Sequence, residues 1–132
     1  MAKVELKARR VGLAVAAAGA LAVGAPAAAH HGWSWAEGEQ TTLKGVIQQV
    51  SMAPPHPTLR VKAADGVVWR VELGNPGKTQ RSGFTAKSAS PGDAVTVLGN
   101  RALDKKQAHM KAVRITVRGK VYDMYPERIA AN

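Results

Sequence analysis

The residues of this chain best suited to chemistry are its four histidines, His30, His31, His56 and His109. The chain contains no cysteine, which excludes a thiolate metal site, a disulfide framework, a thiol nucleophile and an iron–sulfur cluster. Imidazole nitrogens are therefore its best metal donors. A set of nitrogen donors favours Cu(II) or Ni(II), and copper has the higher intrinsic affinity. The thioethers of Met52 and Met110 would add ligands for Cu(I).

The first two histidines follow a segment with the layout of a secretory signal peptide. Residues 1–10 carry four basic side chains, and residues 11–29 form an uncharged run of mostly Ala, Gly and Val that ends in small residues. This run approaches the length of a membrane span, but its Ala and Gly content makes it weakly hydrophobic. We therefore expect a signal peptide over residues 1–29, its cleavage during export, and no membrane-spanning segment in the mature protein.

The export route and the compartment follow from the same segment. Arg9-Arg10 fits a twin-arginine signal, but Gly12 stands where that signal has a large apolar residue, so the general secretory route is expected. Small secreted domains of eukaryotes usually contain disulfides, whereas this chain has no cysteine. The sequence therefore predicts a protein of the bacterial periplasm.

The cleavage site decides what the histidines can bind. Cleavage after Ala29 makes His30 the first residue of the mature chain, and cleavage after Ala27 makes it the third. Either end brings a primary amine, backbone nitrogens and imidazoles into one chelate, which His31 or His56 could complete. The expected metal ligands are therefore His30, His31 and His56. Binding requires a deprotonated amine and neutral imidazoles, so it should weaken as the pH falls.

A small all-β domain is expected to position these side chains. Apolar and polar residues alternate in several short segments that are separated by turn residues. The expected strands are residues 41–50, 58–62, 67–73, 94–98, 110–118 and 121–124. A polar stretch, residues 78–86, is expected to form a helical turn that leaves Phe84 packed on the barrel. Five or six short strands with one helical break between the third and fourth indicate an OB-like barrel with one short helix.

Three segments follow the signal peptide in this interpretation: an irregular N-terminal arm over residues 30–40, the OB-like β-barrel domain over residues 41–126, and a C-terminal tail over residues 127–132. Gly45 inside the first strand is expected to mark a bulge or a tight bend. His56 lies among three prolines in residues 52–57. Prolines lack the amide donor of a strand, so this segment is expected to be a stiff extended loop.

Size and charge exclude several classes of function. The net charge is +10, and it is +7 once residues 1–29, with their four basic residues and one acid, are removed. About 100 residues can bury a modest core but cannot form an elaborate active-site cleft. Aromatic residues are few and export removes the protein from cytoplasmic nucleic acid, so nucleic-acid binding is not expected. No arrangement of nucleophile and base stands out, so we expect no enzyme.

Two motifs of this chain are especially specific: the His30-His31 pair straight after the signal and the turn Pro91-Gly92-Asp93 that enters a strand. With these motifs the chain resembles a bacterial family of short exported proteins, domain-of-unknown-function family 6152. Similar proteins have an aromatic residue and Asn-Pro-His where this chain has Met52-Ala-Pro-Pro-His56, which keeps the histidine but changes the loop before it. The resemblance implies a periplasmic β-barrel and draws attention to His30, His31 and His56. It implies no ligand.

Two functions are expected from these observations. The first is a small periplasmic binding protein for copper or another divalent metal, with His30, His31 and His56 as ligands. The second is a non-enzymatic envelope module that binds a protein partner through Trp33 and Trp35, because tryptophans are enriched at interface hot spots. The histidines would then be ordinary polar residues of an arm and a loop. Replacing His30 or Trp35 by alanine would separate the two.

Overall fold

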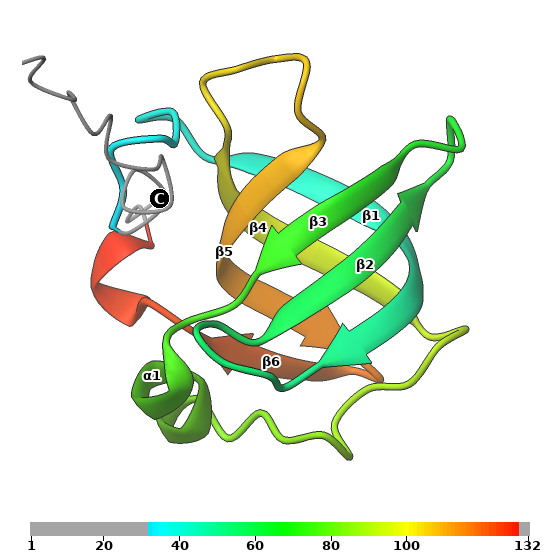
Figure 1. Ribbon diagram of the computed structural model, residues 1–132. Helices are drawn as coiled ribbons and strands as arrows, with labels where there is room; N and C mark the ends of the chain where they lie inside the picture. The colour runs from blue at the N-terminus through cyan, green and yellow to red at the C-terminus, as the bar shows by residue number, and fades with distance from the viewer. Residues whose placement is uncertain (1–31, 130–132) are drawn as a thin grey trace, which may run out of the picture.

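The computed structural model describes residues 32–129, and five of its strands form a closed barrel (Figure 1). The strands are β1 (Thr41–Ser51), β2 (Thr58–Ala63), β3 (Val68–Glu72), β4 (Ala94–Arg101) and β5 (His109–Val117). Antiparallel pairs join β1 to β2, β2 to β3, β1 to β4 and β4 to β5. A parallel pair between β3 and β5 closes the barrel. The expected all-β, OB-like barrel is confirmed, while the expected signal peptide lies outside the described residues.

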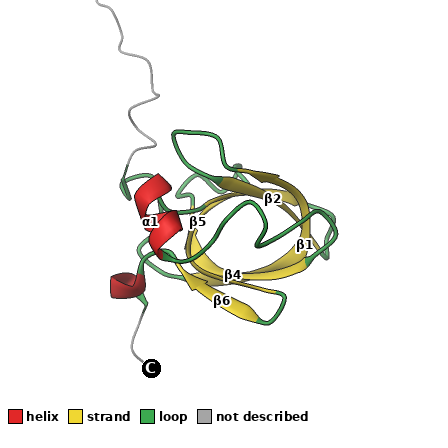
Figure 2. Cartoon of the chain, turned by 90° about the horizontal axis from the view of Figure 1, so that it is seen from below, coloured by secondary structure: helices red, strands yellow, loops and turns green. Residues whose placement is uncertain are grey.

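Three further elements extend the barrel. Strand β6 (Lys120–Asp123) pairs with the end of β5, and a short 3₁₀ helix follows at Pro126–Arg128. The single α-helix among residues 32–129, α1 (Pro76–Arg81), begins where the Asn75 side chain accepts a hydrogen bond from the backbone of Lys78, as N-cap residues do. It lies beside one end of the barrel in Figures 1 and 2.

The barrel interior holds the apolar core that the alternating pattern predicts. Inward positions of the strands supply its fully buried aliphatic side chains, which include Ile47, Leu59, Val61, Val71, Val97 and Ile115. Phe84, in the segment after α1, is 1% exposed and packs edge-on against Tyr122 with ring centroids 5.3 Å apart. The expected docking of Phe84 on the barrel is therefore confirmed.

Gly45 allows two strands to approach closely, but it is not itself the bulge. A Cβ at this position would lie 2.4 Å from the carbonyl oxygen of Lys62 on β2, a distance that no side chain tolerates. The register between β1 and β2 shifts two positions later, between Ile47 and Gln49. Glycine is needed here because a neighbouring backbone occupies the space of a side chain.

Candidate functional site

The parallel pair that closes the barrel, called the seam below, brings a set of polar residues together. Arg70 pairs with His109 and Glu72 pairs with Lys111, one from β3 and one from β5 in each case. The pair between them, Val71 and Met110, belongs to the core. Successive side chains of a strand point to opposite faces, so the polar residues lie on the outer face of the barrel.

Three of these outward residues are nevertheless buried. Glu72 is 4% exposed, His109 is 7% exposed and Lys111 is 2% exposed. Charged side chains are rarely buried this deeply unless they are paired. We call Glu72, His109 and Lys111 the seam cluster.

The described part of the N-terminal arm, residues 32–40, covers the seam cluster. It is fastened to the loop after β4 by a bridge between Ala36 and Ala102 and by a hydrogen bond of 2.9 Å from the Leu103 amide to the Trp35 carbonyl. The Trp35 ring stacks on the imidazole of His109, with centroids 4.2 Å apart. The arm therefore shields from water an outer face that the strand pattern alone would leave exposed.

Lys111 ties the beginning of the described arm to the seam. Its ammonium donates a hydrogen bond of 2.8 Å to the carbonyl of Gly32 and lies 4.7 Å from the centre of the Trp33 ring. Burial lowers the pKa of Lys111. The negative charge of Glu72 opposes that shift, and the positive charge of Arg128 adds to it. The lysine thus lies between Glu72 and the start of the arm.

Glu72 is the negative centre of the cluster. Its Oε1 lies 3.3 Å from Nε2 of His109 and 3.9 Å from a guanidinium nitrogen of Arg70. Burial acts to raise the pKa of Glu72, but the hydrogen bond from His109 and the positive fields of His109, His56 and Arg70 outweigh it. The pKa therefore lies below its usual value, and the carboxylate stays ionised at neutral pH.

His56 lies on the same side of the barrel as Glu72. It is half-buried in the loop before β2, whose Pro57 carbonyl accepts a hydrogen bond of 2.9 Å from the Leu73 amide. Thr58 at the start of β2 pairs with Glu72, and the charge of His56 contributes to the lowered pKa of Glu72. One predicted ligand, His56, is therefore near enough to Glu72 for its charge to act on that carboxylate, and His109 contacts the same carboxylate. The sequence did not place Glu72 or His109 in the site.

The other predicted ligands have different positions. His30 and His31 lie outside the described residues. Met110 is 2% exposed and belongs to the core, on the opposite face of β5 from His109, while Met52 is 39% exposed in the loop after β1. Within residues 32–129 there is no group of three or more His, Cys, Asp and Glu side chains arranged to hold a metal ion.

No helix in the described part of the chain is long and apolar enough to cross a membrane.

Comparison with known proteins supports the fold and identifies the family. A chain of the S. pombe Stn1–Ten1 complex is similar in structure, with a TM-score of 0.51 and 21% sequence identity, over 61% of this chain and 59% of that chain. The search of the curated proteins found no match. The model of a family described as "Family of unknown function (DUF6152)" matches residues 18–111. This range includes His30, His31, His56 and the whole seam cluster. The chain belongs to this family of unknown function, DUF6152.

Proposed function

We propose that this protein is a small binding protein of the bacterial periplasm that takes up copper or another divalent metal at the seam. His56 and His109 would supply imidazoles there. His30 and His31, at the start of the arm, would supply the remaining nitrogen donors.

One contact carries the proposal: the hydrogen bond of 2.8 Å between the Lys111 ammonium and the Gly32 carbonyl. Lys111 is the partner of Glu72 across the seam, and Gly32 is the residue directly after His31. Consecutive Cα atoms are about 3.8 Å apart, so the chain cannot carry His31 far from this anchor. In this proposal, the tie would keep the His-His pair within reach of His56 and His109.

Glu72 has a positioning role in this proposal. Metal-bound histidines usually donate their second ring nitrogen to a carboxylate, which fixes the orientation of the ring and raises its basicity. In this proposal Glu72, whose Oε1 lies 3.3 Å from Nε2 of His109, would orient the imidazole that binds the metal. Neutral imidazoles are required, so affinity should fall as the pH falls through the range in which histidine titrates.

The arm tryptophans weigh against the second function, an envelope module that binds a partner protein. Trp35 stacks on His109, and the Trp33 ring packs edge-on against Tyr125 with centroids 4.9 Å apart. Arg128 covers Trp33 at 3.9 Å. Hot-spot side chains must be available to a partner, whereas these two rings already contact the protein's own residues.

Native mass spectrometry of protein purified from the periplasm, with and without added Cu(II), tests the proposal. The same spectra report the first residue of the chain and the bound metal. We expect one copper per chain, loss of copper in His30→Ala and in His56→Ala, and affinity about 10- to 100-fold lower in Glu72→Gln. The matched control is Glu39→Gln, which removes an exposed carboxylate of the same arm.

Two results would overturn the proposal. One is a mature chain that ignores copper and other divalent metals at micromolar concentrations. The other is copper binding that survives both histidine substitutions, since adventitious binding elsewhere would then explain it. Failure of a partner protein to bind Trp33→Ala, with metal binding intact, would instead support the interaction module.

A further inference from the structure

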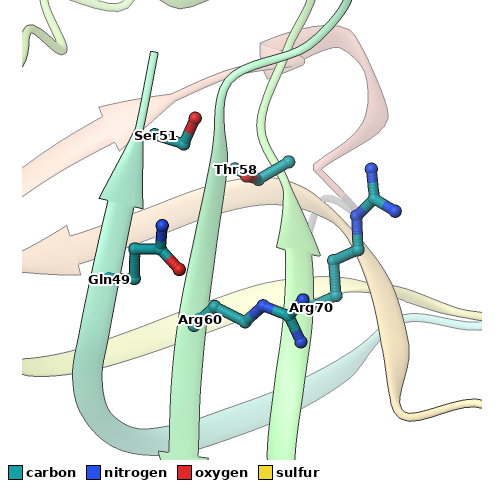
Figure 3. Close-up of a pocket in the computed structure, with 5 residues that line it drawn as sticks. All are labelled: Gln49, Ser51, Thr58, Arg60 and Arg70. Atoms are coloured by element: carbon teal, nitrogen blue, oxygen red, sulfur yellow. The ribbon is translucent and has the colours of Figure 1, made fainter. Parts of the chain in front are cut away.

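A second polar surface lies on the outer face of β1, β2 and β3, outside the part of the barrel that residues 32–40 cover. Five side chains line a hollow of about 240 Å³ there: Gln49, Ser51, Thr58, Arg60 and Arg70. Figure 3 shows them on three adjacent strands, with Arg60 reaching across toward β3. We call this surface the open face.

The strand register sets the two arginines side by side. Gln49 pairs with Arg60, and Arg60 pairs with Arg70, so the three side chains form one row across the sheet. Ser51 pairs with Thr58 in the next outward row. Like charges directly opposite each other destabilise a sheet, so this pair of arginines costs the fold stability.

The open face is rich in donors that no neighbouring side chain uses. Within residues 32–129, the side chains of Gln49, Thr58 and Arg60 make no hydrogen bond or ion pair, and Arg70 has only its contact of 3.9 Å with Glu72. None of the five lining residues is acidic. The Arg60 guanidinium, two hydroxyls and an amide thus border one small space that no acidic residue lines, and Arg70, which lies 3.9 Å from Glu72, completes the lining.

We propose that the open face is a binding site for a phosphoryl group, with Arg60 and Arg70 as its principal ligands. Guanidinium forks match phosphate oxygens in bidentate pairs. A terminal phosphoryl group has three acceptor oxygens and a charge of about −1.5 to −2, and it can use more of these donors than a planar carboxylate can. The hollow is smaller than the roughly 300–1,000 Å³ of pockets that enclose drug-sized ligands. It therefore fits the charged group and not the whole of a large ligand.

Two sources could present this group, a soluble phosphate compound or the headgroup of a phospholipid, and two arms of one experiment distinguish them. In the first arm, inorganic phosphate is titrated into the ¹⁵N-labelled full-length protein and amide shifts are followed by NMR, with acetate as the comparison anion. In the second arm, sedimentation measures binding to vesicles of phosphatidic acid and of phosphatidylcholine. Both arms use the wild type, Arg60→Gln, Arg60→Lys and Lys106→Gln.

We expect phosphate or phosphatidic acid to bind, with shifts centred on Gln49, Thr58, Arg60 and Arg70. Arg60→Gln should weaken binding at least about tenfold, because a hydrogen-bonded charge is lost. The affinity of Arg60→Lys should lie between those of the wild type and Arg60→Gln, since lysine keeps the charge but lacks the guanidinium fork. Lys106→Gln removes one exposed charge from the loop between β4 and β5 and should leave binding nearly unchanged.

The two arms give different answers about the source. Arg60-dependent binding of inorganic phosphate assigns the site to a soluble ligand, and Arg60-dependent sedimentation without phosphate shifts assigns it to a lipid headgroup. Equal weakening by Arg60→Gln and Lys106→Gln would overturn the proposal, because it would mean a general attraction to a basic protein. Equal shifts with acetate, or no binding in either arm, would overturn it too.

Discussion

The seam cluster and the open face are consecutive parts of the same two rows of side chains. One row runs Gln49, Arg60, Arg70, His109, and the next runs Ser51, Thr58, Glu72, Lys111. Strand alternation puts all eight positions on the outer surface of the barrel. What differs along each row is the cover, since the N-terminal arm lies over the β5 end and leaves the β1 end exposed.

This difference in cover goes with a difference in pairing. At the seam, the single carboxylate of Glu72 faces His109 at 3.3 Å, and Lys111 donates to a carbonyl of the arm. On the open face, Arg60 stands directly opposite Arg70. Buried charges must be paired, whereas water screens exposed like charges. The N-terminal arm, and not the barrel, therefore determines which outward residues form a buried cluster.

Glu72→Gln should cause the largest change in the free energy of unfolding. The substitution leaves a buried cation at Lys111 without its carboxylate, so we expect a loss of about 3 kcal/mol in the free energy of unfolding. Urea denaturation of the metal-free protein measures this loss. Glu39→Gln, at an exposed position of the arm, should change stability by less than about 0.5 kcal/mol. If both variants gave similar small changes, the seam would be as solvated as the open face.

Removing part of the cover should have the next largest effect. Trp35→Ala deletes the ring stacked on His109 and admits water to the seam cluster, which should cost about 2 kcal/mol. Leu103→Ala is the matched control, because Leu103 lies in the same region and its side chain is 59% exposed. It should cost less than about 0.5 kcal/mol. Hydrogen exchange at the amides of β3 and β5 would show whether the loss is local to the seam.

The barrel could be predicted from the sequence because local signals specify most of it. In the hairpin between β2 and β3, Gly66 has a φ of +86°, which glycine adopts without strain. In the turn before β4, Gly92 has a φ of +95° and Asp93 accepts a hydrogen bond of 2.8 Å from the Ser90 amide. Each turn is recognisable from a few adjacent residues, so most strand ends could be placed to within one residue. Strand β4 runs three residues past its expected end, to Arg101, and the helix is at Pro76–Arg81 and not at residues 78–86.

The seam could not be predicted in the same way. It depends on the parallel pairing of β3 with β5, two strands that are far apart in the sequence, and on an arm that shows no strand or helix periodicity. Glu72 and His109 occupy outward positions, where polar residues are ordinary and signal nothing. Of Glu72, His109 and His56, only His56 was predicted as a ligand, from its imidazole and from the family resemblance. His30 and His31 lie outside the described residues, so their part in the site stays a prediction.

Acid should weaken the seam specifically, though by less than either substitution at it. The pKa of Glu72 is lower in the folded protein than in the unfolded chain, where it is about 4.3. Its contribution to stability is therefore complete above the unfolded value and is lost as the pH falls through the folded value. Urea midpoints of the metal-free wild type and Glu72→Gln should converge as the pH falls below about 4. A constant difference between pH 7 and pH 3 would contradict the lowered pKa.

The smallest expected change in the free energy of unfolding is a gain and not a loss. Arg60→Gln relieves the repulsion between directly opposite arginines, so the free energy of unfolding without phosphate should rise by about 0.5 kcal/mol. Lys106→Gln, which has no such neighbour, should leave it unchanged. With saturating phosphate, the wild type should become more stable than Arg60→Gln, because a ligand that binds only the folded state stabilises the wild type by mass action. If Arg60→Gln were less stable than the wild type in the absence of phosphate, Arg60 would contribute to the stability of the fold. The two arginines would then carry no information about a ligand.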